Sequence, residues 1–310
     1  MRFSNLSCFL VLGCILLSKS LFAQQVIDSL FVGNVDNPAY SLNQGPLILV
    51  DAFHNNGKTL NNGFSPVADI LIKDGYKLSS LNREFVTTQI DSTSILVIID
   101  ALHEINIDNW KLPTPSAFTK LEINNINNWV KNGGNLLLVA DHMPFPGASK
   151  KLAEEFGIEW INGFVIDSLR WDLSEFIKDD NTLSEHAITK GRFKDESLDS
   201  VFSYYGSGFK INNPNITGLF RFINKDIVSY QTEEAWKMFP HTPLLTTSNL
   251  YQAAALEHGK GRVVIVAESS LFSAQLVGKN RKPIGINYIE KGQNLQFVLN
   301  VFHWLSRIIE

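Results

Sequence analysis

The sequence predicts an α/β fold with a parallel sheet, helices on both faces of that sheet, and a loop-rich β extension. Continuous apolar runs of strand length occur at 46–56, 93–105, 135–142 and 261–269, as in strands buried on both faces. Amphipathic segments of helix length lie between most of these runs. A stretch of short, aromatic-rich runs at about 160–245 has neither pattern and indicates the extension.

The first part of the chain after residue 45 follows a strand–helix–strand order. PLILVDAFHNN (46–56) is a buried strand with a polar end, and SPVADILIKDGY (65–76) has apolar residues at helical spacing and closes on Gly75. KLSSLN (77–82) is a short strand candidate. TSILVIIDALHEI (93–105) is a second buried strand that ends in an acid and a histidine.

The middle of the chain repeats this order. TKLEINNINNWVKNGG (119–134) begins with Thr119 and Glu122 at capping-box spacing and stops at a glycine pair, which predicts a helix. NLLLVADH (135–142) follows as a third buried strand. SKKLAEEFG (149–157) is a short amphipathic helix. GRVVIVAES (261–269) restores the strand pattern, and QNLQFVLNVFHWLSRIIE (293–310) is a closing helix.

The first 23 residues have the layout of a secretory signal peptide. Arg2 precedes an apolar run from Cys8 to Leu17, and Ala23 offers a small residue for cleavage. An uncleaved anchor is the alternative, and Val11–Cys14 weakly resembles a lipoprotein cleavage site. We expect cleavage near Ala23, which makes the protein secreted or periplasmic, in a bacterial envelope. Residues 24–44 then form an extended lead-in, and residues 45–310 form the α/β domain.

Composition limits the chemistry and the partners of this domain. The 310-residue chain has a net charge of −4, so nothing indicates binding to nucleic acid. No later run reaches the roughly 18 apolar residues of a membrane span, so we expect none in the mature chain. Both cysteines lie in the leader, which excludes cysteine nucleophiles, cysteine metal ligands and disulfides after cleavage.

Ionisable residues follow four of the predicted strands. Because carboxyl ends of parallel strands meet at one edge of a sheet, and ligands bind there, we expect these residues to lie together. The strand ends are Asp51-x-x-His54, Asp100-x-x-His103, Asp141-His142 and Glu268. Asn55, beside His54, belongs to the same candidate ligand-binding set as Asp51, His54 and His103.

Three interpretations of this edge remain open. A divalent metal site would use His54, Asp141 and His142, leaving one position for water or substrate; no cofactor is certain. A metal-free acid–base site would use Glu268 with Asp51 or Asp141 as carboxylates in different environments; the catalytic candidates we name are Asp141, His142 and Glu268. In the third, these side chains only cap loops at strand ends.

The segment PFPGAS after His142 adds a second feature to this edge. It leads into the helix at 149–157, so the backbone amides near Gly147 and Ser149 are expected to open toward the site and bind an anion or hydroxyl. Ser269 and Ser270 follow a strand, where a nucleophile elbow would lie. The chain lacks G-x-S-x-G, however, which disfavours a serine hydrolase.

Three blocks of the sequence resemble a known superfamily. They are VDAFHNN, FTKLEINNINNWVKNGGNLLLVADHMPFPGASKKLAEEFGI, and GKGRVVIVAESSLFSAQ with NLQFVLNVFHWL. They resemble the class I glutamine amidotransferase-like superfamily, and within it a secreted bacterial family of unknown function that is distantly related to ThuA-like proteins. The resemblance spans about residues 45–310 and implies a flavodoxin-like sheet.

The resemblance implies little about activity. Amidotransferases use a cysteine at a strand-to-helix elbow, which the predicted mature chain lacks, so it is not a glutaminase of that kind. ThuA-like relatives suggest a carbohydrate ligand. The leading hypothesis is therefore an exported protein that binds, with or without cysteine-independent hydrolysis, a small polar or carbohydrate ligand at the carboxyl edge. The alternative is a non-catalytic accessory or scaffold domain of the cell envelope.

Overall fold

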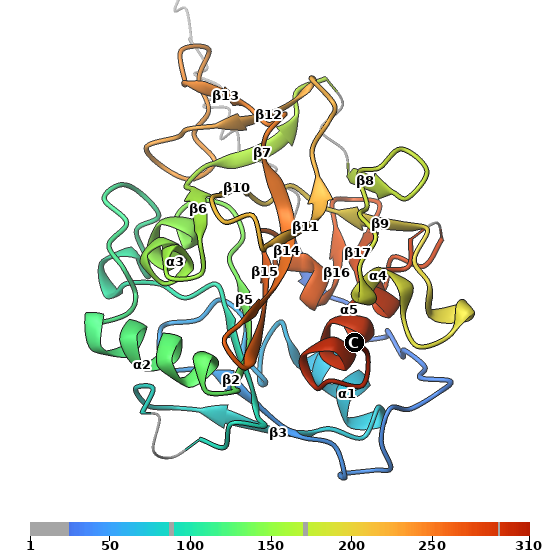
Figure 1. Ribbon diagram of the computed structural model, residues 1–310. Coiled ribbons are helices and arrows are strands. Elements are labelled where there is room, and N and C mark those ends of the chain that lie inside the picture. Colours follow the sequence, from blue (N-terminus) through green and yellow to red (C-terminus); the bar gives the residue numbers. More distant parts are fainter. Residues whose placement is uncertain (1–24, 87–89, 170–172, 291) are drawn as a thin grey trace, which may run out of the picture.

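The computed structural model describes residues 25–86, 90–169, 173–290 and 292–310 (Figure 1). The predicted signal peptide, residues 1–23, lies outside these ranges together with Cys8 and Cys14. In the described part of the chain, no helix has both the length and the apolar character needed to span a membrane.

Five parallel strands form the centre of the fold. In spatial order they are β3 (Lys77–Leu81), β2 (Leu47–Asp51), β4 (Ile95–Ile99), β5 (Asn135–Val139) and β15 (Gly261–Val266). Every residue of β4 and β5 is buried. The predicted strands therefore form, and their lack of alternation is explained by helices that cover both faces.

The sheet continues in antiparallel register beyond β15. The added strands are β14 (Tyr251–His258), β10 (Gly208–Ile211) and β6 (Ile158–Ile161), with β11 (Thr217–Arg221) also paired to β14. Within the described residues this makes one mixed sheet of nine strands. Part of the predicted extension thus continues the central sheet, because its short strands supply the hydrogen-bonding partners that β14 requires.

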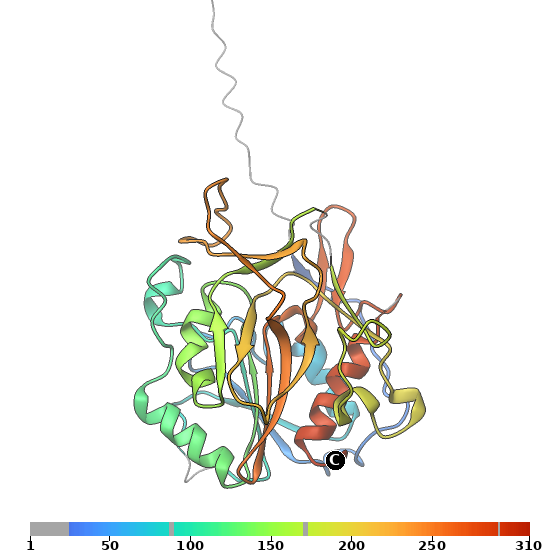
Figure 2. The same ribbon diagram turned by 45° about the horizontal axis from the view of Figure 1, so that its top comes forward.

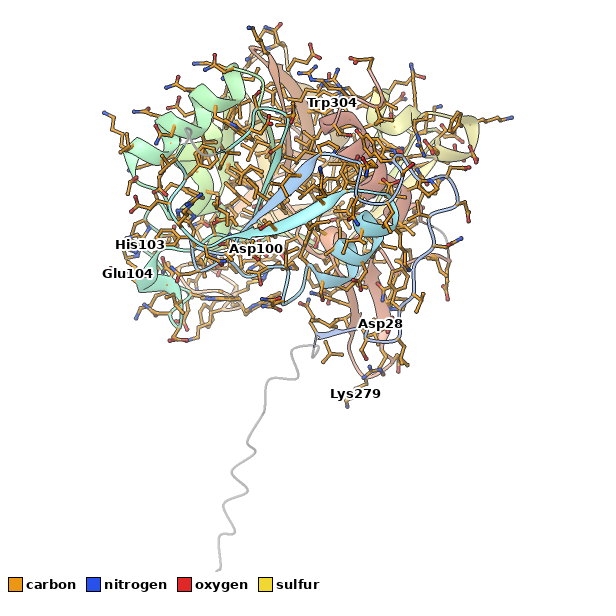
Figure 3. The ribbon with its side chains drawn as sticks, turned by 90° about the horizontal axis from the view of Figure 1, so that it is seen from below. Asp28, Asp100, His103, Glu104, Lys279 and Trp304 are labelled. Atoms are coloured by element: carbon orange, nitrogen blue, oxygen red, sulfur yellow. The ribbon has the colours of Figure 1, made fainter. Side chains whose placement is uncertain are left out.

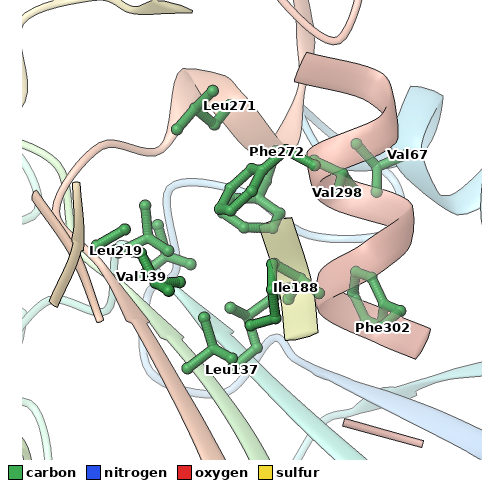
Figure 4. Close-up of a cluster of buried hydrophobic side chains, with 14 of the residues drawn as sticks. Val67, Leu137, Val139, Ile188, Leu219, Leu271, Phe272, Val298 and Phe302 are labelled. Atoms are coloured by element: carbon green, nitrogen blue, oxygen red, sulfur yellow. The ribbon is translucent and has the colours of Figure 1, made fainter. Parts of the chain in front are cut away.

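Two helices cover each face of the parallel strands. Helices α1 (Ser65–Lys73) and α5 (Asn294–Leu305) lie on one face, and α2 (Lys120–Lys131) and α3 (Phe145–Glu154) on the other (Figure 1). Alternate residues of β5 serve the two cores. Leu137 and Val139 pack with α1 and α5 (Figure 4), and Leu136 packs with α2 and α3. The protein is therefore an α/β layered fold around a mainly parallel sheet.

The ends of two helices follow from their sequences. Thr119 and Glu122 form the predicted capping box at the start of α2. Helix α3 begins at Phe145, four residues earlier than predicted, with Pro146 in its first turn. Proline is favoured there because its missing N–H would have no helical partner, so Phe145, Pro146 and Gly147 belong to the helix and Pro144 caps it.

The remaining elements form smaller units around this sheet. A three-stranded sheet of β7 (Phe164–Asp167), β12 (Ile227–Tyr230) and β13 (Leu244–Thr246) lies at the top of Figures 1 and 2. A second comprises β1 (Val26–Ile27), β16 (Ala274–Val277) and β17 (Lys282–Gly285), and β8 (Ser174–Ile177) pairs with β9 (Ser200–Ser203). A short helix, α4 (Ala187–Lys190), packs against α5. The 3₁₀ turns are η2 (Glu104–Asn106), η3 (Lys194–Glu196) and η4 (Ser270–Phe272).

Candidate functional site

The carboxyl ends of β2, β4, β5 and β15 bring acidic side chains to one edge of the sheet. Asp51 is the last residue of β2, Asp100 follows β4 directly, and Asp141 and Glu268 lie two residues beyond β5 and β15. The structure divides these residues into two groups. We call Asp51, His54 and Glu122 the His54 cluster. Lys58, Asp100, Asp141, Glu268 and Ser269 are the Lys58 cluster.

In the His54 cluster, one imidazole lies between two carboxylates. Its Nδ1 is 2.8 Å from Asp51 Oδ2, and its Nε2 is 3.0 Å from Glu122 Oε1. All three side chains are buried. Because ionised carboxylates only accept hydrogen bonds, this geometry suits an imidazolium that donates from both nitrogens. His54 therefore ties the end of β2 to the start of α2.

The charges of the His54 cluster support each other. Burial alone would lower the pKa of His54, but Asp51 and Glu122 outweigh it, and the pKa lies above its ordinary value. Burial alone would raise the pKa of Glu122. Hydrogen bonds from Thr119 and His54 outweigh that effect, and the pKa is lowered. Both groups are stabilised in their charged forms.

The Lys58 cluster surrounds one buried ammonium group. Lys58 Nζ is 3.2 Å from Asp100 Oδ2 and 2.5 Å from Ser269 Oγ, to both of which it donates. Ser269 Oγ donates in turn to Asp141 Oδ2 at 2.9 Å. The backbone N–H of Asp141 donates to Asp100 Oδ1 at 2.9 Å. These bonds join the loop after β2 to the ends of β4, β5 and β15.

The Lys58 cluster contains three acids and one base, which shifts its pKa values. Burial alone would lower the pKa of Lys58, but the charges of Asp100, Asp141 and Glu268 outweigh it and raise the pKa. Burial raises the pKa of Asp100, although Lys58 opposes this. Burial and the charge of Asp141 raise the pKa of Glu268 to about 8. At neutral pH Glu268 is therefore mostly protonated.

Asp141 differs from the other acids of the Lys58 cluster in its exposure. Asp100 and Glu268 are buried, whereas Asp141 is partly exposed. Its Oδ1 accepts the backbone N–H of His142 at 2.8 Å, and Oδ2 accepts the Ser269 hydroxyl. Glu268 uses both oxygens internally, accepting the backbone N–H groups of Ser270 and Leu271 at 2.7 and 3.1 Å. Of the three acids, Asp141 is the one that solvent or a ligand can reach.

The histidine next to Asp141 lies among aromatic rings. His142 stacks on Phe164 with ring centroids 4.2 Å apart and meets the edge of Trp236 at 4.6 Å. Trp110 and Phe145 lie 5.9 and 6.0 Å away. Its Nδ1 is 2.8 Å from the carbonyl oxygen of Met143. His142 is thus held by packing and lies 8% exposed.

Four of the eight described non-glycine residues with positive φ lie at or near this edge. Asn55, Asp100, Tyr205 and Trp236 have φ values of 49°, 52°, 61° and 65°. Such values are uncommon outside glycine, above all for bulky residues, and they often mark functional sites. After Tyr205, Gly206 has φ of 82°, and a Cβ there would lie 2.3 Å from the carbonyl oxygen of Ala267. That loop therefore packs directly against the end of β15.

The other predicted site residues have protein partners. Asn55 is exposed and donates through Nδ2 to the carbonyl oxygen of Leu102 at 3.1 Å. His103 caps η2 by accepting the Ile105 N–H at 3.3 Å. Gly147 donates its N–H to Asn162 Oδ1 at 3.1 Å.

Ser149 lies inside α3 and is fully buried, and its hydroxyl has no hydrogen-bond partner. Together with the protein partner of Gly147, this means that the start of α3 does not present the free amides that the sequence suggested.

The three residues predicted as metal ligands have different surroundings. Both ring nitrogens of His54 face carboxylates, His142 lies in the aromatic group, and Asp141 bonds Ser269. Among the described residues, no group of three or more His, Cys, Asp and Glu side chains could hold a metal ion. The structure therefore does not assemble His54, Asp141 and His142 as one ligand set.

Sequence reasoning missed the roles of Lys58 and Glu122 at this edge. Lys58 lies in a polar loop, where nothing in the sequence marks a lysine as buried. Glu122 was identified only as a helix cap, and its second carboxylate oxygen does serve Thr119. One signal was available for Ser269, which follows Glu268 at a strand end.

The raised pKa of Glu268 predicts a pH-dependent stability that Glu268→Gln removes. The folded protein retains a proton up to about pH 8, whereas the unfolded chain releases it near 4.5, so the wild-type free energy of unfolding falls between these values. Glutamine lacks this titration. At pH 5 we expect the free energy of unfolding of the variant to be about 1 kcal/mol lower than that of the wild type, because one hydrogen bond is missing. As pH rises this difference should shrink and then reverse, because only the wild type loses stability. Urea unfolding at pH 5, 6.5 and 8 checks this; parallel pH dependences would contradict it.

No protein-family profile and no curated protein matches the chain. Solved structures do. The mmIFT52 N-terminal domain is 17% identical with a TM-score of 0.56, covering 84% of this chain and 97% of that one. A cytoplasmic protein from Salmonella typhimurium LT2 is 14% identical with a TM-score of 0.50, covering 84% and 99%. A ThuA-like protein from Parabacteroides merdae is 10% identical with a TM-score of 0.41, covering 84% and 90%.

These similarities are at the level of fold. The first two structures are 17% and 14% identical to this chain, so they show a shared architecture and no shared activity. They agree with the mixed α/β fold and its mainly parallel central sheet.

Proposed function

We propose that this is an exported, cysteine-independent hydrolase that binds a small polar ligand, with carbohydrate the first class to test, at the carboxyl edge of the sheet. The observation that supports it best is the Lys58 cluster, in which a partly exposed carboxylate, Asp141, adjoins a buried carboxyl group of raised pKa, Glu268. A reachable carboxylate held beside a buried carboxyl group can accept a proton or a hydrogen bond from a ligand, as a general base does in hydrolysis.

The roles in this proposal follow from exposure. Asp141 faces the ligand and acts as a base or hydrogen-bond acceptor, and Ser269, which accepts a hydrogen bond from Lys58, donates to Asp141 Oδ2 and holds that carboxylate in place. Glu268 touches no ligand, since its oxygens are occupied by amides. It positions η4, and its proton limits the negative charge around Asp141. Partly exposed Trp110, Tyr205 and Trp236 lie near the same edge, where aromatic faces suit sugar rings.

Asp141→Asn tests this proposal. The substitution keeps the size of the side chain but removes its basicity, so we expect ligand-induced thermal shifts to disappear and any hydrolysis to fall at least about 100-fold. The assays are a thermal-shift screen against monosaccharides and release of nitrophenol from nitrophenyl glycosides. His103→Ala, on the same edge, is the control and retains both. Absence of any shift or turnover in the wild type would reject the proposal.

One observation favours a second candidate, a non-catalytic envelope domain. Apart from Asp141, the charged side chains of both clusters are buried, and within each cluster they form hydrogen bonds with one another. Such closed networks also occur where acids only stabilise strand ends. In that case Asp141→Asn would change stability while no ligand bound.

We also infer a finer placement of the fold and of the protein. Numbered along the chain, the five parallel strands have the order 2-1-3-4-5, which is the flavodoxin-like order and supports membership of the class I glutamine amidotransferase-like superfamily. The leader-like residues 1–23 support export to the periplasm or beyond. To test export, the protein is recovered from the periplasmic fraction and its N-terminus is sequenced. We expect the mature chain to begin near residue 24.

A further inference from the structure

A cavity lies at the amino-terminal edge of the parallel sheet, opposite the Lys58 cluster. It measures about 510 Å³ and is bounded by the end of α2, the β14–β15 turn and the end of α5. This volume falls in the range of small-molecule sites. Trp304, near the end of α5, and Asp100, at the carboxyl edge, lie well apart in Figure 3. The cavity is therefore separate from the Lys58 cluster.

One buried polar side chain in this cavity has an unsatisfied acceptor. Asn135 is the first residue of β5 and is 3% exposed, and its Oδ1 accepts no hydrogen bond. It points to the face of the sheet that carries Leu137, the face that α5 covers. A buried acceptor without a donor destabilises the protein. A hydroxyl or amine group of a ligand would satisfy it.

The mouth of the cavity is cationic. Lys260 and Arg307 are exposed and line it, and among the described residues no carboxylate pairs with either. The acid that also lines it, Glu257, is exposed and pairs with Arg262, which it shares with Glu310, at 3.2 Å from Nη2. A carboxylate would be attracted to Lys260 and Arg307.

The base of the cavity favours donors instead of anions. Helices α2 and α5 both end there, at Lys131 and Leu305, and the carbonyl ends of helices are electronegative. Asn135 Oδ1 is the acceptor on this wall that no described protein group satisfies, and the two helix ends add a potential that favours the hydrogens of a ligand's hydroxyl groups. We propose that this amino-edge cavity binds a small hydroxylated carboxylate of the sugar-acid class, with its hydroxyls against Asn135 and its carboxylate between Lys260 and Arg307.

The experiment uses gluconate as the probe in isothermal titration calorimetry, with glucose and acetate as its two halves. We expect the full-length wild type to bind gluconate at least tenfold more tightly than either. Arg307→Ala removes an exposed side chain and should fold normally. The variant should bind gluconate at least tenfold more weakly than the wild type and bind glucose with unchanged affinity. Asn135→Leu keeps the volume of the side chain and should weaken gluconate and glucose alike.

A matched variant separates this site from the one at the carboxyl edge. Asp141→Asn should leave gluconate binding unchanged, because that carboxylate lies at the other end of the strands. If Asp141→Asn abolishes gluconate binding and Arg307→Ala does not, the ligand belongs to the carboxyl edge and the amino-edge proposal is wrong. Equal affinity for gluconate and acetate, or no saturable binding, also overturns it. None of these results depends on hydrolysis at Asp141.

Discussion

His54→Ala should lower the free energy of unfolding by about 3–5 kcal/mol, the range expected when one partner of a buried ion pair is removed. The variant leaves the carboxylates of Asp51 and Glu122 buried with no imidazolium between them. It also separates the end of β2 from the first turn of α2. Urea unfolding at pH 6, followed by far-ultraviolet circular dichroism, measures the effect.

His103→Ala is the matched control for this prediction. Asp51-x-x-His54 and Asp100-x-x-His103 have the same spacing after a buried strand. His103, however, only accepts one backbone N–H in a half-buried turn. His103→Ala should therefore lower the free energy of unfolding by no more than about 1 kcal/mol. Equal losses in the two variants would show that His54 is an ordinary cap and would contradict the role we assign to its cluster.

The pH dependence of the His54 effect has a defined sign. His54 has a raised pKa, so its contribution is complete below its unfolded value of 6.5 and is lost as pH rises through the folded value. Glu122 has a lowered pKa, so its contribution is complete above 4.5 and is lost as pH falls through the folded value. The difference between wild type and His54→Ala should therefore be largest between about pH 4.5 and 6.5.

Lys58→Met should have the second large effect, a loss of about 3–5 kcal/mol at pH 8. Methionine fills the space of the lysine stem but leaves Asp100, Asp141 and Glu268 with no cation among them. The loss should shrink at pH 5, because Asp100 and Glu268 have raised pKa values and take up protons more readily. Lys58 itself stays charged throughout, since its pKa is raised above 10.5.

Thermal unfolding of Lys58→Met at pH 5 and pH 8 measures this effect. Lys77→Met, at an exposed position of β3, is the matched control and should change stability by less than about 0.5 kcal/mol. A loss that is equal at both pH values would mean that packing of the lysine stem, and not its charge, stabilises the edge.

Much of the architecture could be predicted from the sequence because it depends on local patterns. Continuous apolar runs such as that of β5 and the helical spacing of α2 are visible within short windows, and both elements formed where they were predicted. The start of α3 was predicted four residues too late, because PFPGAS was interpreted as a segment that leads into the helix. Strands β6, β10 and β11 could not be assigned to the sheet, because their partners are distant in sequence.

The candidate site shows the same division more sharply. The sequence by itself determined that acids and histidines follow four parallel strands, and hence that Asp51, Asp100, Asp141 and Glu268 share an edge. Only the tertiary structure decided what each does. It placed Glu122 against His54 and Lys58 among three acids, so that two D-x-x-H repeats of equal spacing differ in burial and partners. The physical reason is that spacing sets where a side chain leaves a strand, whereas its charge state depends on neighbours that only folding brings within hydrogen-bonding distance.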